Sequence, residues 1–400
     1  MVQSSKRNTL WWLKLVLCLG AIAVAGMVLA LALGATLDPT YSYYAAMSSS
    51  LWTTFGPHLV MLALIAAIVG IACWRLGSHR LGLAAIVISL AGVLASTFIV
   101  GSIMLAAGAA GGRINPVTGL FLGKMAEPRP DQIATFSNVE GNALTAAIYL
   151  PPTPPLVAPV YAYIHGGGFM IGTNTETAAD LRWFADRGWV VFSLSYRLFT
   201  PDNPTWNKAP VDVACGLAWV YANAETFGGD PERIVLAGDS AGGNLAINLA
   251  YGAALGRVRS NCGNVPVPKA VVVQYPAVDP VATYERGFPV PGFEPRMLMM
   301  GYVGGTPDEF PERISAISSA TYISAEAPPT LVIEPERDGL VVSDSVYAFV
   351  EAAKAAGVEV DIVRIPFANH VYDQIASNSI GNQARLTITH EYLRKRNLAP

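Results

Sequence analysis

Residues 234–243 read Ile-Val-Leu-Ala-Gly-Asp-Ser-Ala-Gly-Gly. The apolar residues at the start predict a short buried strand, and the segment 244–250 that follows has helical spacing. Gly238, Ser240 and Gly242 therefore lie in a tight turn between strand and helix, where only small residues fit two positions before and after the serine. Such a turn holds a hydroxyl out at the carboxyl edge of a sheet, so we predict that Ser240 is a nucleophile.

Composition limits the classes of protein to which this chain can belong. It has 400 residues, of which 52% are hydrophobic and 14% are charged. The formal net charge is −3 and no basic block is present, so nucleic-acid binding has no electrostatic support. None of the four cysteines lies in a Cys-x-x-Cys pair, so the sequence indicates neither a zinc site nor a thiol redox motif.

The excess of apolar residues is concentrated before residue 112. Three stretches there are each about 20 residues or longer, which is enough for a helix to cross about 30 Å of hydrocarbon. We therefore predict a membrane domain over residues 1–112, with the lipid bilayer as its partner. The predicted spans are 11–34, 51–73 and 81–110.

Basic residues set the expected orientation of these spans. Lys6 and Arg7 precede the first span, and Arg75 and Arg80 lie between the second and the third. The loop 35–50 contains neither lysine nor arginine. The positive-inside rule then predicts a cytoplasmic N-terminus, so that an odd number of spans places the rest of the chain outside the cytoplasm, in a periplasmic or extracellular location.

After a Gly- and Pro-rich linker predicted over 113–130, the composition becomes that of a globular domain over 131–400. Strands alternate with helices there, which predicts an α/β fold with a doubly wound, mostly parallel sheet. A loop-like insertion over 279–327 is predicted to be a substrate-binding cap. Its Met297-Leu298-Met299-Met300 stretch either shapes an apolar pocket or packs on the core. The predicted strands are 143–150, 159–164, 189–195, 234–237, 270–274, 330–333 and 358–365, and the predicted helices are 211–224, 344–356 and 382–395.

A glycine run follows the second of these strands, in His165-Gly166-Gly167-Gly168-Phe169. Consecutive glycines let the backbone turn without Cβ clashes and leave N–H groups free to face a substrate carbonyl. We predict Gly167, Gly168 and Ala241 as the donors of an oxyanion hole. His165 is interpreted as a structural hydrogen-bonding group rather than a catalytic base.

The glycine run, Tyr196-Arg197-Leu198 and the Gly-Asp-Ser-Ala-Gly-Gly turn resemble motifs of the hormone-sensitive-lipase-like branch of the α/β-hydrolase esterases. The likeness covers about 143–373 and leaves out the predicted spans. It implies an α/β-hydrolase fold and hydrolysis of carboxylic esters by a Ser-Asp-His triad, with no metal and no organic cofactor. In this fold the three residues follow in the order serine, acid, histidine.

That order leaves two of the five histidines as candidates for the base, His370 and His390. His390 lies inside the last predicted helix and is interpreted as a surface residue. His370 follows the last predicted strand, where a loop can reach back to Ser240, so we predict His370 as the base.

Three carboxylates follow the strand 330–333 and are candidates for the acid: Glu334, Glu336 and Asp338. The resemblance places the acid at Asp338, although Gly339 stands where family members often have proline. Glu334, which precedes Pro335, remains the alternative.

The leading hypothesis is a membrane-anchored serine hydrolase of short-to-medium acyl or lipid-like esters. One alternative is an acyltransferase that hands the acyl group to a membrane or envelope acceptor, and another is a non-catalytic binding or scaffold protein with this fold. Cys215 and Cys262 both lie in the domain predicted to be outside the cytoplasm, where a disulfide is permitted but not established by the sequence. The sequence does not indicate an oligomeric state.

Overall fold

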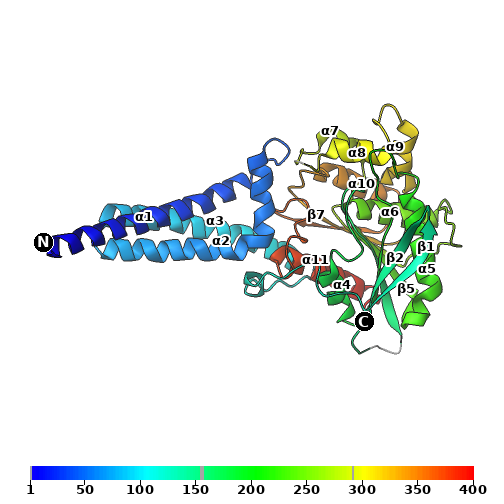
Figure 1. Ribbon diagram of the computed structural model, residues 1–400, viewed down its shortest axis with the longest axis horizontal. Coiled ribbons are helices and arrows are strands. Elements are labelled where there is room, and N and C mark those ends of the chain that lie inside the picture. The colour runs from blue at the N-terminus through cyan, green and yellow to red at the C-terminus, as the bar shows by residue number, and fades with distance from the viewer. Residues whose placement is uncertain (1, 154–156, 291) are drawn as a thin grey trace.

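The computed structural model describes residues 2–153, 157–290 and 292–400. Three long helices form a bundle at one end of the molecule, and an α/β domain lies at the other end (Figure 1). Each of these helices contains a segment that is long and apolar enough to cross a membrane. They are α1 (Val2–Gly34), α2 (Tyr43–Arg75) and α3 (His79–Ala109).

The α/β domain is built on one eight-stranded sheet with the order β1-β2-β4-β3-β5-β6-β7-β8. Strand β2 pairs antiparallel with β1 and β4, and every pairing from β4 to β8 is parallel. The predicted mostly parallel α/β fold is therefore confirmed. The strands are β1 (Gln132–Val139), β2 (Asn142–Tyr149), β3 (Ala158–Ile164), β4 (Val190–Leu194), β5 (Gly229–Asp239), β6 (Ala270–Gln274), β7 (Thr330–Pro335) and β8 (Val360–Ile365).

Helices cover both faces of this sheet, because buried side chains alternate between the two faces along each strand. Ala162 and Ile164 of β3 pack with α5 (Ala209–Asn223), α6 (Ser240–Ala254) and α10 (Ser343–Ala355). Tyr161 and Tyr163 pack on the other face, with α4 (Ala178–Ala185) and α11 (Ile380–Lys395). The remaining elements are α7 (Pro280–Arg286), α8 (Pro295–Val303), α9 (Pro311–Ile317) and the short 3₁₀ helices η1 (Thr118–Leu120), η2 (Ala224–Phe227) and η3 (Ser319–Tyr322).

The short helices α7, α8 and α9 lie together at one edge of the domain (Figure 1). They belong to the chain between β6 and β7, over the range in which the sequence predicts a cap. Leu298, Met299 and Tyr302 of α8 are buried in the same core as α5 and α6. This insertion is therefore anchored on the core rather than held out as a free loop.

The core on the α11 face continues into the helix bundle. Trp52 of α2 and Ile103 of α3 belong to the same buried cluster as Tyr372 and Ile388 of the α/β domain. The segment after α3 is also tied down, since the Arg113 N–H donates to Thr387 Oγ1 at 2.8 Å and the Asn115 N–H to Gln383 Oε1 at 2.7 Å. The helix bundle and the α/β domain thus pack directly against each other, in addition to being joined by the segment after α3.

Helix α2 turns sharply near its N-terminal end (Figure 1). Pro57 lies inside this helix, and an interior proline removes one helical hydrogen bond and bends the axis. We call residues 43–56, which precede the bend, the crossing segment. Asn369 Nδ2 donates to the Ala46 carbonyl oxygen at 3.0 Å, and a Cβ atom on Gly381 of α11 would lie 2.9 Å from Thr53 Cβ. The crossing segment therefore lies against the α/β domain.

A disulfide joins Cys215 of α5 to Cys262, which lies between α6 and β6, with a Cα–Cα distance of 4.9 Å. The sequence left this pairing open because it cannot report the separation of the two residues in space.

Candidate active site

Ser240 stands at the junction of β5 and α6 with a φ of +51°. A non-glycine residue rarely adopts this left-handed conformation, which occurs in strained turns at functional sites. A Cβ atom on Gly238 would lie 2.4 Å from the Gly242 carbonyl oxygen, and one on Gly242 would lie 2.2 Å from the Ile164 carbonyl oxygen. The two glycines of the turn are therefore sterically required, which is the reason the sequence analysis gave for the pattern.

The structure brings the three predicted triad residues together at the carboxyl edge of the sheet. His370 Nε2 lies 2.9 Å from Ser240 Oγ, and His370 Nδ1 lies 2.6 Å from Asp338 Oδ2. Asp338 follows β7 and His370 follows β8. Parallel strands present their carboxyl ends at one edge, which is how residues far apart in sequence meet there.

The carboxylate of Asp338 is held by backbone groups as well as by the imidazole. Its Oδ1 accepts hydrogen bonds from the N–H groups of Leu340 at 2.8 Å and Val341 at 2.9 Å. Because Oδ1 is fixed in this way, Oδ2 is directed at His370. This geometry favours Asp338 over its alternative.

Glu334, the alternative acid, lies inside β7 and is fully buried. Burial raises the pKa of its carboxyl well above the ordinary value, and the nearby charge of Asp338 raises it further. A carboxyl whose charged form is disfavoured by burial is a poor partner for a positive imidazolium. Glu334 is thus poorly suited to serve as the acid.

The glycine loop packs closely against Asp239 of the serine turn. A Cβ atom on Gly166 would lie 2.4 Å from Asp239 Oδ2, and Gly167 and Gly168 have φ values of +100° and +60°. The Gly167 carbonyl accepts hydrogen bonds from two N–H groups downstream, at 3.1 and 3.0 Å, which tightens the loop. Ala241 lies in the first turn of α6, where N–H groups have no acceptor within the helix.

His165 is held by the backbone of this loop and by Tyr196. Its Nδ1 is 2.9 Å from the Gly166 carbonyl oxygen, and its ring stacks on Tyr196 with centroids 4.5 Å apart. The Tyr196 hydroxyl donates to the His165 carbonyl at 2.9 Å. Burial lowers the pKa of His165 to about 4, so the imidazole is neutral at pH 7. These contacts fit the structural role predicted for this histidine.

The sequence analysis missed Asn369, which immediately precedes the predicted base. Its Oδ1 accepts hydrogen bonds from the N–H groups of His370 at 2.7 Å and Gly339 at 2.9 Å. Asn369 therefore connects the loop of the base to the loop of the acid. Its only signal in the sequence is its position beside His370.

A buried network of charged side chains around Arg385 was also not predicted from the sequence. Arg385 of α11 pairs with Asp180 of α4 and with Asp373, the latter at 2.9 Å. The Tyr275 hydroxyl donates to Asp373 Oδ1 at 2.7 Å, and the Tyr275 ring centroid lies 4.5 Å from that of His370. Through the Tyr275 ring, the network packs against the imidazole of His370. Across residues 2–153, 157–290 and 292–400, no three His, Cys, Asp or Glu side chains gather as a metal site.

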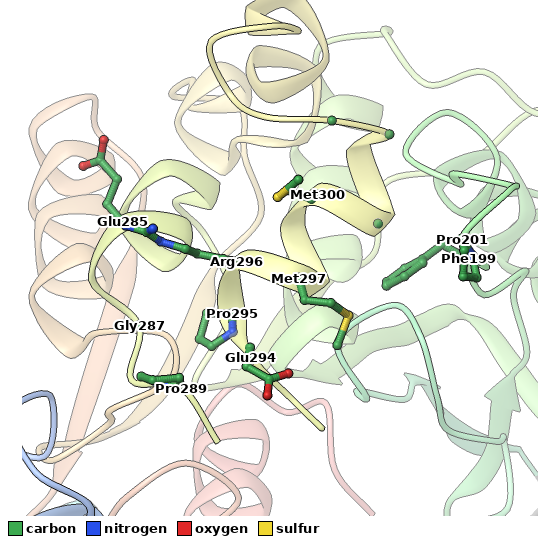
Figure 2. A pocket seen from close by; sticks show the side chains of 13 residues that line it. Phe199, Pro201, Glu285, Gly287, Pro289, Glu294, Pro295, Arg296, Met297 and Met300 are labelled. Carbon is green, nitrogen blue, oxygen red and sulfur yellow. The ribbon is translucent and has the colours of Figure 1, made fainter. Parts of the chain in front are cut away.

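Among the cavities lined in part by the predicted cap, two of different size have apolar walls. The larger, of about 950 Å³, is lined by Met297 and Met300 of α8 and by Phe199 and Pro201 on the opposite side (Figure 2). No residue of the predicted triad lines it. The smaller, of about 270 Å³, is mostly apolar and is lined by His370. Two methionines of α8 therefore shape a pocket, while Leu298 and Met299 pack on the core, so each interpretation of this stretch holds for part of it.

Residues 147–352, more than half of the chain, match the protein family described as BD-FAE. The chain belongs to this family. Ethyl acetate hydrolase of Pseudomonas putida is 27% identical over 270 residues, which cover 64% of this chain and 80% of that protein. Esterase LipC of Mycobacterium tuberculosis is 30% identical over 237 residues, 58% of this chain and 57% of LipC. This BD-FAE protein thus spans little more than half the length of LipC.

Among solved structures, esterase 2 of Thermogutta terrifontis, in a form phosphonylated by sarin, superimposes with a TM-score of 0.58 at 21% identity. The match covers 68% of this chain and 98% of that one, and it shows the fold. The curated esterase relatives place the BD-FAE protein among the carboxylesterase-type hydrolases. The predicted membership of the α/β-hydrolase esterases is confirmed, and the hormone-sensitive-lipase-like branch stays a prediction.

Proposed function

We propose that this protein is a membrane-anchored serine esterase in which Ser240, His370 and Asp338 form the catalytic triad. The observation that carries the proposal is the hydrogen-bonded chain from Ser240 Oγ to His370 at 2.9 Å and on to Asp338 at 2.6 Å. A nucleophile, a base and an orienting acid in this order are the requirements for activating a serine hydroxyl.

The chemistry follows from the positions of these groups. His370 Nε2 takes the proton as Ser240 Oγ attacks the ester carbonyl, and the N–H groups of Gly167, Gly168 and Ala241 stabilise the oxyanion. Collapse of the tetrahedral intermediate breaks the ester bond, and His370 gives the proton to the departing alcohol. Water then attacks the acyl-enzyme by the same route and releases the acid. Asp338 fixes the imidazole tautomer and stabilises its charge during both steps.

The three helices α1–α3 serve as the anchor in this proposal, over residues 1–112, and the catalytic domain occupies 131–400. The distribution of basic residues supports a cytoplasmic N-terminus and an extracytoplasmic catalytic domain. The Cys215–Cys262 disulfide supports the same side, because disulfides persist in oxidising compartments.

The substrate class we propose is a carboxylic ester with a short-to-medium acyl group. The cavity beside His370, of about 270 Å³, is near the lower end of the range for ligand pockets, roughly 300–1,000 Å³. The names of the relatives, an ethyl acetate hydrolase and an esterase, point to the same class.

The test uses the full chain in detergent micelles with p-nitrophenyl butyrate. We expect Ser240→Ala to lower kcat by a factor on the order of 10⁶, while Ser315→Ala, at an exposed serine of α9, keeps the wild-type rate. A fluorophosphonate probe should label Ser240 in the wild type and in the Ser315 variant. Equal rates for the two variants, or no labelling of Ser240, would refute the triad.

The orientation has a separate test. A membrane-impermeant fluorophosphonate should label Ser240 on intact cells or spheroplasts. Labelling that appears only after lysis would place the catalytic domain in the cytoplasm, whatever the activity.

A further inference from the structure

The smaller cavity has two walls of different origin. One is formed by Phe288, Val290 and Phe293 of the insertion between β6 and β7. The other is formed by Tyr43, Ala46, Met47 and Ser50, all on the crossing segment of α2. A residue from the predicted base loop, His370, closes the space between them.

Two of the residues that line this cavity contact groups of the predicted active site. His370, whose Nε2 is hydrogen-bonded to Ser240, lines it directly. Phe293 also lines it, and the tip of the Phe293 ring lies 2.9 Å from the position that a Cβ on Gly168 would occupy. The cavity is therefore bounded by the predicted base and by a ring that packs on the predicted oxyanion loop.

The crossing segment is tied to the loop of the base by hydrogen bonds. Asn369 Nδ2 donates to the Ala46 carbonyl oxygen at 3.0 Å and to Ser50 Oγ at 3.3 Å. These bonds hold the wall formed by α2 at a fixed position relative to His370. The wall formed by α2 is therefore a fixed part of this site.

The level of the crossing segment follows from the bend at Pro57. The part of α2 from Pro57 to Arg75 rises about 28 Å, which is close to the hydrocarbon thickness of a bilayer, about 30 Å. Residues 43–56 then lie at the level of the lipid headgroups. Tyr43 and Met47, at the rim of the cavity, are 57% and 42% exposed, and tyrosine at the interface is typical of membrane proteins.

The larger cavity is a poorer site for an acyl chain. It is lined by Glu285, Glu294 and Arg296 as well as by apolar residues, and by none of the triad residues. An alkyl chain there would contact none of the triad residues and would not find a uniformly apolar wall.

We propose that the crossing segment of α2 is a wall of the acyl-binding pocket, so that the acyl chain of the ester lies between Met47 and Phe293 at the membrane surface. The membrane anchor is then a specificity-determining part of the enzyme. This inference rests on the proposed esterase function and adds to it the surface against which the substrate lies.

The first experiment maps the position of the substrate's acyl chain in the protein. The probe is an eight-carbon alkyl fluorophosphonate with a diazirine at the end of its chain, added to the full protein in phosphatidylcholine nanodiscs and then irradiated. We expect Ser240 to be labelled and the diazirine to cross-link to residues 43–56 or 288–293. Labelling of Ser240 with cross-links only to 199–201 and 297–305 would overturn the pocket proposal and leave the esterase intact. If Ser240 is not labelled at all, the esterase function fails and the pocket proposal fails with it.

The second experiment changes the depth of the pocket. Met47→Ala should raise the ratio of kcat/KM for p-nitrophenyl decanoate over butyrate about tenfold, because it removes side-chain volume from the wall. Met47→Trp should lower the same ratio about tenfold. The matched control is Met61→Ala, a methionine of α2 that is equally exposed at 42% and lies off the cavity, and it should keep the wild-type ratio. Wild-type ratios in both Met47 variants would overturn the proposal.

Discussion

The side-chain nitrogen of Asn369 lies 3.0 Å from the carbonyl oxygen of Ala46, 323 positions earlier in the chain. The oxygen of the same amide accepts from the N–H groups of His370 and Gly339. Only one orientation of the amide satisfies these partners, since two of them donate and the carbonyl accepts. One side chain thus joins a membrane-length helix to the loops of the predicted acid and base.

We predict that Asn369 positions His370. Asn369→Ala leaves two N–H groups without their acceptor, which costs about 1–3 kcal/mol for each buried group, so kcat for p-nitrophenyl butyrate should fall about 10- to 100-fold with KM little changed. Asn369→Asp keeps an acceptor for both N–H groups and should restore part of kcat. Its added negative charge near the imidazole should move the acidic limb of the pH–rate profile to higher pH.

Asn264→Ala is the control for Asn369, because it removes an exposed asparagine amide that lies between α6 and β6, away from the site. It should stay close to wild-type kcat. An Asn369→Ala variant with unchanged kcat and an unchanged pH profile would show that the residue does not position the base.

We predict that Asp338, and not Glu334, is the acid. Asp338→Asn should lower kcat by a factor on the order of 10⁴, because the amide favours the wrong imidazole tautomer. Glu334→Gln should change kcat by less than tenfold, since burial raises the pKa of Glu334 and disfavours its charged form. A larger loss of kcat in Glu334→Gln than in Asp338→Asn, measured by steady-state hydrolysis, would assign the acid to Glu334.

We predict that His165 makes the folded state sensitive to acid. Its folded-state pKa is about 4, below the ordinary value of 6.5. A depressed folded pKa means that stability is fully present above pH 6.5 and is lost as pH falls towards 4, because the unfolded chain takes up the proton first. The full difference corresponds to about 3 kcal/mol. The thermal midpoint, followed by tryptophan fluorescence, should fall less between pH 7.5 and 4.5 in His165→Asn than in the wild type. Curves of thermal midpoint against pH that run parallel for the wild type and His165→Asn would contradict this role of His165.

We predict that the disulfide stabilises the catalytic domain. It closes a loop over a sequence separation of 47, for which chain entropy gives about 3–4 kcal/mol. The double variant Cys215→Ala, Cys262→Ser should therefore lower the thermal midpoint by roughly 10 °C. Reductant should bring the wild type to the same midpoint and leave the double variant unchanged. Mass spectrometry that finds both thiols free in the wild type would rule the bond out.

Local sequence was sufficient for most elements of the fold. The predicted strands 143–150 and 270–274 match β2 and β6 to within one residue, because each carries a mostly apolar run that is buried in the sheet. The analysis missed β1 at the edge of the sheet, where most residues are exposed or half-buried and no such run exists. It also missed α4, whose eight residues are too few to show a helical period.

The sequence by itself determined the turn at Ser240, the glycine loop and the three membrane-length helices, because each depends on neighbours within about 20 residues. The prediction of His370 as the base followed from the order of residues in the fold, since the chain has only five histidines. The tertiary structure decided how Asp338 is held, the pairing of Cys215 with Cys262, and the meeting of the crossing segment with Asn369 and His370. These depend on distances between residues far apart in the chain, which packing sets and which no local pattern of amino acids encodes.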